Sequence, residues 1–115
     1  MSGGQSPCLG GRRRIGGFLI FAQDGQFLGE ISSNRFAQNS ISNQYGAYGS
    51  TYSSTSIFND FSKYGGQFSA QSPFKQFATS PPILVSNDVA VAFLTVNQAK
   101  SPRVDPNGVK ACLNL

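Results

Sequence analysis

The chain has 115 residues, of which 39% are hydrophobic and only 12% are charged, and its formal net charge is +4. One domain with a modest core fits this length, and the low charge argues against a chain kept disordered by charge repulsion. Histidine is absent, which excludes the common serine–histidine and histidine–metal sites.

The N-terminal residues 1–17 are rich in glycine, serine and arginine and are predicted to form a flexible basic arm. Its run of Arg12, Arg13 and Arg14 is a candidate for a weak contact with an acidic partner. The apolar run FLIFA that follows is shorter than a signal peptide requires. A cytoplasmic location is therefore favoured, and no segment has the length of a transmembrane helix.

The two cysteines, Cys8 and Cys112, lie near opposite ends of the chain. They could close one long loop, but spacing alone does not show that two cysteines meet. Without histidine or a close cysteine pair, they do not indicate a zinc site. We expect two free thiols in a reducing compartment.

Two pairs of β-strands are predicted, one at each end of a domain spanning residues 18–106. The first is a hairpin whose apolar runs flank Asp24-Gly25, a dipeptide suited to a two-residue turn. The second follows Pro81-Pro82 and turns around Ser86-Asn87-Asp88, where valine, leucine and phenylalanine favour strands. The two pairs can join in a single sheet. Residues 107–115 form a C-terminal tail that can include a short turn of helix from Pro106 onward.

A sixteen-residue repeat lies between the strand pairs. Two copies align well and a third, beginning at Ser72 with Phe77 in register, is degraded. A repeat of this kind indicates a small unit that needs its neighbours to bury an apolar face. The matched positions are Ser40, Ile41, Asn43, Tyr45, Tyr48, Gly49 and Tyr52, which recur as Ser56, Ile57, Asn59, Phe61, Tyr64, Gly65 and Phe68.

The rings of the repeat are spaced by three and four residues, which would suit one face of a helix. Its glycines would each cost a helix about 1 kcal/mol relative to alanine, and its serines and asparagines prefer caps and turns. We therefore predict a mainly β single domain in which two strand pairs flank a turn-rich aromatic repeat. In this interpretation the turns tuck aromatic rings against the sheet in place of an aliphatic core.

The segments LGEISSNRF, SISNQYGAYGSTYS, SIFNDFSKYGG, SPPILV and FLTVN, taken in order, carry a resemblance. They resemble a group of small bacterial proteins, many of them cyanobacterial, in which a strand leads into Tyr-Gly-Ser repeats and then a closing strand. The resemblance spans residues 24–106 and implies this order of elements; it implies no catalytic residues. Some relatives look exported. The third copy, SPFKQFATS, departs from the pattern because it lacks the Tyr-Gly-Ser element.

Catalysis is not indicated by the residues available. A serine–lysine pair would need one of four lysines as base, and the spacing favours none of them. Asp24 and Asp88 are explained as turn residues, Asp105 as a pre-proline loop residue, and Glu30 and Asp60 have no reason to converge. Calcium binding by Asn34, Asn43, Asn59 and Asp60 is disfavoured because calcium sites need several carboxylates. We therefore expect no enzyme activity, no cofactor and no metal.

The function that the sequence favours is a non-catalytic structural or binding module, which binds a protein or polymer through exposed tyrosines. For these rings, internal packing is the competing interpretation and the one that the sequence favours. Single-stranded nucleic-acid binding is an alternative that the scarcity of cations in residues 33–82 disfavours. Self-association of a low-complexity segment is another. The candidate binding surface consists of Tyr45, Tyr48, Tyr52, Tyr64, Arg12, Arg13 and Arg14.

Overall fold

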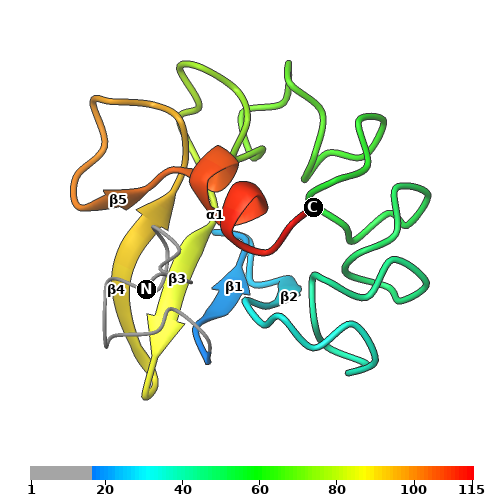
Figure 1. Ribbon diagram of the computed structural model, residues 1–115. Helices are drawn as coiled ribbons and strands as arrows, with labels where there is room; N and C mark the ends of the chain where they lie inside the picture. The colour runs from blue at the N-terminus through cyan, green and yellow to red at the C-terminus, as the bar shows by residue number, and fades with distance from the viewer. Residues whose placement is uncertain (1–16) are drawn as a thin grey trace.

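The computed structural model describes residues 17–115 and contains one five-stranded sheet, a long turn segment and one short helix (Figure 1). The strands lie in the order β2-β1-β3-β4-β5. This confirms the mainly β single domain. The elements are β1 (Leu19–Phe21), β2 (Phe27–Glu30), β3 (Ile83–Ser86), β4 (Val89–Leu94), β5 (Arg103–Val104) and α1 (Pro106–Cys112).

The first predicted hairpin is formed by the antiparallel strands β1 and β2. Its loop differs from the expected two-residue turn. The N–H of Gly25 donates to the carbonyl of Ala22, and the N–H of Ala22 donates to the carbonyl of Gln26, so three residues form the loop. Among the three loop residues only Gly25 has a positive φ, of 97°, which matches a type I turn followed by a left-handed residue. Asp24 accepts the N–H of Gln26 and is a turn residue, as predicted.

The second predicted hairpin is formed by β3 and β4. Asn87 and Asp88 have φ values of 52° and 65°, the pair of left-handed residues that a two-residue type I′ turn requires. β1 pairs with β3 in antiparallel register, with Ile20 opposite Leu84. The two hairpins are therefore joined in one sheet, as the sequence allowed.

The turn segment, residues 32–82, leaves the sheet after β2 and returns to it at β3. Its loops fan outward along the right and the top of the view in Figure 1, and the last of them reach the residues that follow β4, where the N–H of Val96 donates to the carbonyl of Pro73. Backbone N–H groups donate to the carbonyl three residues earlier at nearly every third position. The donors in residues 40–78 that follow this pattern are Ser40, Asn43, Gly46, Ser53, Ser56, Asn59, Ser62, Gly65, Ser69, Ser72, Lys75 and Ala78. The segment is thus a chain of consecutive turns, and the helix alternative is wrong.

Serine and asparagine side chains complete these turns. Ser40, Ser56 and Ser72 are fully buried, and each accepts the N–H of the residue two positions on. Asn43 and Asn59 accept in the same way and also donate, through Nδ2, to the carbonyl six residues earlier. This explains why the segment needs short polar side chains, which satisfy the backbone groups that a sheet or helix would otherwise pair.

The core is mainly aliphatic and lies between the sheet, the turn segment and α1. Its fully buried members include Ile20 and Leu28 of the sheet, Ile31 directly after β2, and Ile41 in the turn segment. Of the aromatic side chains, only Tyr64 is buried, while Phe18, Tyr48 and Phe58 are partly buried against the cluster. The prediction that aromatic rings replace an aliphatic core is therefore wrong for most of the rings.

The helix α1 closes the core from the C-terminal side, and its start at Pro106 was predicted. Asp105 caps it by accepting the N–H of Asn107, while Val109 and Leu113 are buried. The segment set apart as a tail therefore packs into the domain. Within residues 17–115, no helix has the length and apolar character needed to cross a membrane.

Cys112 forms a disulfide, so the expectation of a free thiol is wrong at this position. Disulfides persist mainly in oxidising compartments, so the reducing compartment that was expected together with free thiols is not supported. Cys8 lies outside the described residues, as do Arg12, Arg13 and Arg14.

The third copy offers a test of the turn chemistry, because Lys75 stands where the first two copies have Asn43 and Asn59. We expect Lys75→Asn to stabilise the protein by about 0.5–1.5 kcal/mol. Its carboxamide can accept the N–H of Phe77 and donate to the carbonyl of Ser69, as Asn59 does with Phe61 and Ser53. Urea denaturation measures the change. Lys75→Gln is the control, because its longer side chain does not close the same turn; equal stability of the two variants would contradict the expectation.

Candidate binding surface

Six aromatic side chains of the turn segment are strongly exposed to solvent, with exposed fractions between 69% and 99%. They fall into two sets with sixteen-residue spacing, and no ring contact joins them to one another among the described residues. Exposure of so many large rings is unusual for a small domain and makes this surface a candidate for binding. We call this surface the aromatic face; it consists of Phe36, Tyr52 and Phe68, together with Tyr45, Phe61 and Phe77.

The turns explain why these rings point outward. In four of the six cases a side-chain oxygen two residues earlier accepts the N–H of the ring-bearing residue, and these acceptors are Asn34, Asn43, Ser50 and Asn59. The opening residue and the backbone therefore form the inner side of the turn, and the third residue is left at its tip. The residue directly before each ring is polar and exposed as well. These neighbours are Arg35, Gln44, Thr51, Asp60, Gln67 and Gln76.

The four tyrosines proposed from the sequence are divided by the structure. Tyr45 and Tyr52 are 98% and 93% exposed and belong to the aromatic face. Tyr48 is partly buried, with its ring 5.0 Å from that of Phe27, and Tyr64 is 6% exposed. The sequence reasoning also missed the four phenylalanines of the face. A usable signal was present: Tyr48 and Tyr64 stand directly before Gly49 and Gly65, whereas each exposed ring directly follows a polar residue.

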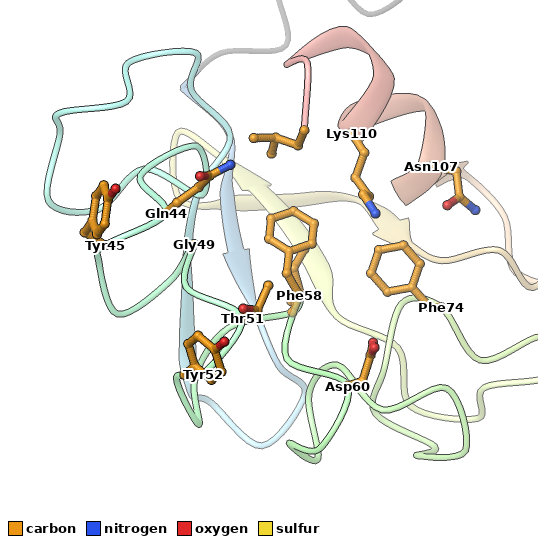
Figure 2. Close-up of a pocket in the computed structure, with 12 residues that line it drawn as sticks. Gln44, Tyr45, Gly49, Thr51, Tyr52, Phe58, Asp60, Phe74, Asn107 and Lys110 are labelled. Carbon is orange, nitrogen blue, oxygen red and sulfur yellow. The ribbon is translucent and has the colours of Figure 1, made fainter.

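A pocket of about 600 Å³ lies between the aromatic face and α1. Tyr45 and Tyr52 stand at one side of it, and Phe58 and Phe74 at the other, below the side chain of Lys110 (Figure 2). This volume is within the range of sites that hold small ligands. The remaining lining residues include uncharged hydrogen-bonding groups on Gln44, Thr51 and Asn107 together with the carboxylate of Asp60.

The charges of the aromatic face and its pocket are few and partly engaged. Lys110 Nζ lies 5.8 Å and 5.7 Å from the ring centroids of Phe58 and Phe74, a cation–π arrangement. Arg35 donates to the carbonyls of Leu113 and Asn114, 3.3 Å away in both cases, and so connects the first turn to the C-terminal residues. Asp60 is the carboxylate of opposite sign at a turn tip.

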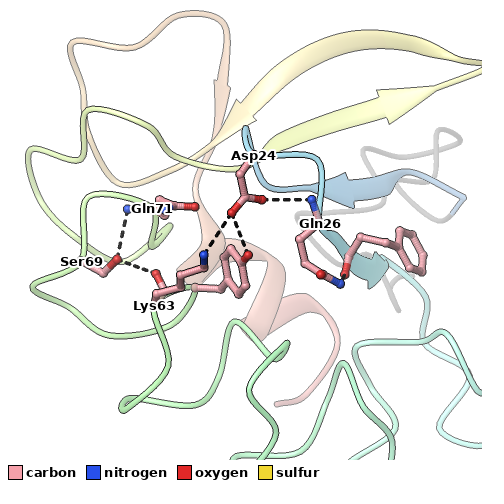
Figure 3. A network of polar contacts seen from close by, with 7 residues as sticks. Asp24, Gln26, Lys63, Ser69 and Gln71 are labelled. Carbon is pink, nitrogen blue, oxygen red and sulfur yellow. Dashed lines mark hydrogen bonds and ion pairs between the residues drawn. The ribbon is translucent and has the colours of Figure 1, made fainter.

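A separate polar cluster fastens the first hairpin to the turn segment (Figure 3). Tyr64 donates its hydroxyl to Asp24 Oδ2 at 2.8 Å, and Lys63 Nζ lies 3.3 Å from the same oxygen. Because Lys63 and Asp24 are surface groups, their ion pair contributes little to stability. The hydrogen bond from the Tyr64 hydroxyl instead fixes the position of the turn segment, because it connects the buried Tyr64 ring to the loop of the first hairpin.

The pKa values of this cluster predict a pH dependence. The pKa of Asp24 is lowered, first by the N–H of Gln26 and then by the Tyr64 hydroxyl, so its contribution to stability is present above its ordinary pKa and is lost as the pH falls through the lowered value. The pKa of Tyr64 is raised, mainly by burial and then by Asp24. Its contribution is complete below its ordinary value of 10.0 and is lost as the pH rises through the raised value.

We therefore expect the urea midpoint to be flat between about pH 5 and about pH 9 with respect to this cluster and to fall on either side. Tyr64→Phe should remove the alkaline decrease that this tyrosine causes and make the acid decrease shallower. Tyr45→Phe, at an exposed ring, is the matched control and should follow the wild-type profile. If Tyr64→Phe leaves the alkaline decrease of the urea midpoint unchanged, another group causes that decrease.

Within residues 17–115, no group of three or more aspartate, glutamate, cysteine or histidine side chains could hold a metal ion. The oxygens of Asn34, Asn43 and Asn59, considered above for calcium, accept backbone N–H groups instead.

A scan against protein-family models gave no match, and neither the curated proteins nor the solved structures contained one. The resemblance to small bacterial proteins therefore stays a prediction.

Proposed function

We propose that this protein is a non-catalytic binding module and that the aromatic face is its binding surface. The observation that carries the proposal is the near-complete exposure of five of the six rings, between 86% and 99%. Exposed rings of this size are costly in water, and here they contribute nothing to the core. Tyrosine and phenylalanine provide large, rigid contact areas for a partner at a low cost in side-chain entropy.

The repeated placement of the rings supports binding over a structural role. A ring that served only the fold would be packed, as Tyr64 is. The exposed rings instead occupy equivalent turn positions in successive sixteen-residue units. A surface built in this way presents the same small contact several times, which favours a partner that is itself extended or repetitive.

The experiment is an amide NMR titration of the labelled protein with three chemically distinct probes. These are cellohexaose as a neutral polymer fragment, a thymidine 20-mer as single-stranded nucleic acid, and the protein itself by dilution. A four-ring variant carrying Tyr45→Ser, Tyr52→Ser, Phe61→Ser and Phe68→Ser removes most of the face. The control variant, Val89→Thr with Val91→Thr, removes exposed apolar groups elsewhere, at positions 60% and 40% exposed in β4.

Perturbed amides at the turn tips with at least one probe, lost in the four-ring variant and kept in the control, would support the proposal. Both variants should retain a dispersed spectrum, because none of the substituted side chains belongs to the core. Absence of any ring-dependent perturbation with all three probes would overturn it.

A further inference from the structure

We infer that the partner of the aromatic face is an uncharged polysaccharide, bound by its turn tips and the adjoining pocket. The inference rests on the proposed function and gives the chemical class of its ligand. Three properties of the face lead to it: its charge, the pairing of rings with hydrogen-bonding groups, and its convex shape beside a concave pocket.

The charge of the face does not suit a polyanion. Of the six polar residues that precede the rings, only Arg35 and Asp60 are charged, with opposite signs. Arg35 is further engaged by the carbonyls of Leu113 and Asn114. Binding to single-stranded nucleic acid draws most of its affinity from a positively charged groove that follows the phosphates, and the turn tips do not provide one.

Each of the remaining four tips pairs one exposed ring with one neutral hydrogen-bonding side chain. The pairs are Gln44 with Tyr45, Thr51 with Tyr52, Gln67 with Phe68 and Gln76 with Phe77. A pyranose ring presents an apolar face of C–H groups and an edge of hydroxyl groups. An aromatic ring can pack on the C–H face, while an amide or hydroxyl beside it bonds to the hydroxyl edge. The same two chemistries thus occur side by side at successive tips.

The shape of the surface indicates a polymer over a small sugar. Small ligands bind in concave sites that bury most of their surface, whereas rings exposed by 86% or more stand clear of the surrounding protein. Each such ring can provide only a weak contact, so useful affinity requires several contacts to one repetitive ligand. The pocket bounded by Tyr45, Tyr52, Phe58 and Phe74 lies beside these turn tips and can hold one sugar unit of the bound polymer more deeply (Figure 2).

Sedimentation with insoluble cellulose, chitin, starch and β-1,3-glucan tests the inference. The wild-type protein and the β4 control variant are expected to be retained on at least one of them, equally at about 50 mM and about 1 M NaCl, because screening does not weaken contacts without net charge. Replacing one exposed ring, as in Tyr52→Ser or Phe61→Ser, should lower the affinity roughly two- to tenfold. The four-ring variant should not be retained.

Retention on none of the four polymers, retention that is lost at high salt, or equal retention of the four-ring variant would each overturn the inference. The proposed function can survive that result. Ring-dependent binding of the thymidine 20-mer, or ring-dependent self-association, would leave the binding module standing with a different partner, whereas absence of all ring-dependent binding would overturn both.

Discussion

Gly65→Ala is expected to destabilise the protein by about 3 kcal/mol or more, a large fraction of the stability of a domain of this size. A methyl group at this position would lie 2.7 Å from the carbonyl oxygen of Ile57 and closer still to that of Asn59. Both oxygens belong to the backbone of the preceding turns. They cannot move aside without disturbing the turn at Asn59, whose carbonyl accepts the N–H of Ser62.

The equivalent position sixteen residues earlier should behave in the same way. A methyl group at Gly49 would meet the carbonyl oxygens of Asn43 and Ile41, so Gly49→Ala is the internal repeat of the experiment. Gly108→Ala is the matched control, because a methyl group there has nothing within 4 Å. Since Gly108 lies in α1, its replacement should stabilise the protein by up to about 1 kcal/mol. Urea denaturation of the three variants measures these changes. A Gly65→Ala variant as stable as wild type would contradict the close approach of Gly65 to the carbonyl oxygens of Ile57 and Asn59.

Asn59→Ala is the second substitution with a large expected effect, a loss of about 2–4 kcal/mol. Asn59 is 8% exposed, and its side chain accepts the N–H of Phe61 and donates to the carbonyl of Ser53. Alanine leaves the Phe61 N–H without its acceptor and removes the donor to a turn six residues away. Thermal and urea denaturation measure the loss.

Two further substitutions separate the roles of this side chain. Asn59→Ser keeps an acceptor for the turn, as Ser56 does for Phe58, but does not replace the amide donor, so an intermediate loss is expected. Asn39→Ala, at an exposed asparagine, should change the stability by less than about 0.5 kcal/mol. Equal losses for Asn59→Ala and Asn39→Ala would show that the side-chain bonds within the turns do not stabilise the segment.

The strands and the type of the middle segment could be predicted because local chemistry decides them. Valine, leucine and phenylalanine on both sides of Asn87-Asp88 indicate a hairpin, and Asn and Asp tolerate the positive φ that its turn adopts. Gly49 and Gly65 correctly indicated that the repeat does not form helices. The loop at Gly25 was predicted one residue too short, because Asp-Gly suits both a two-residue turn and a three-residue loop with its glycine in the left-handed region.

The division of the rings between core and surface could not be predicted from their spacing. Tyr45, Tyr48 and Tyr52 follow one another at intervals of three and four residues, as rings on one face of a helix would. Nevertheless, the middle ring packs against the core, whereas the outer two are exposed. The turns alone do not make this choice, because Phe58 and Phe74 also end turns opened by serine and yet are only partly exposed. The disulfide at Cys112 was missed for a related reason: a separation along the sequence does not indicate which cysteines meet in space.

Nitration of the folded protein with tetranitromethane, followed by peptide mass spectrometry, tests the division of the rings most directly. The four tyrosines differ in their exposure to solvent, with Tyr45 and Tyr52 at the turn tips and Tyr64 in the core. We expect Tyr45 and Tyr52 to be nitrated and Tyr64 to be protected until the protein is denatured. Equal modification of all four tyrosines in the native protein, or a protected Tyr45 and Tyr52, would contradict both the fold of the turn segment and the aromatic face built on it.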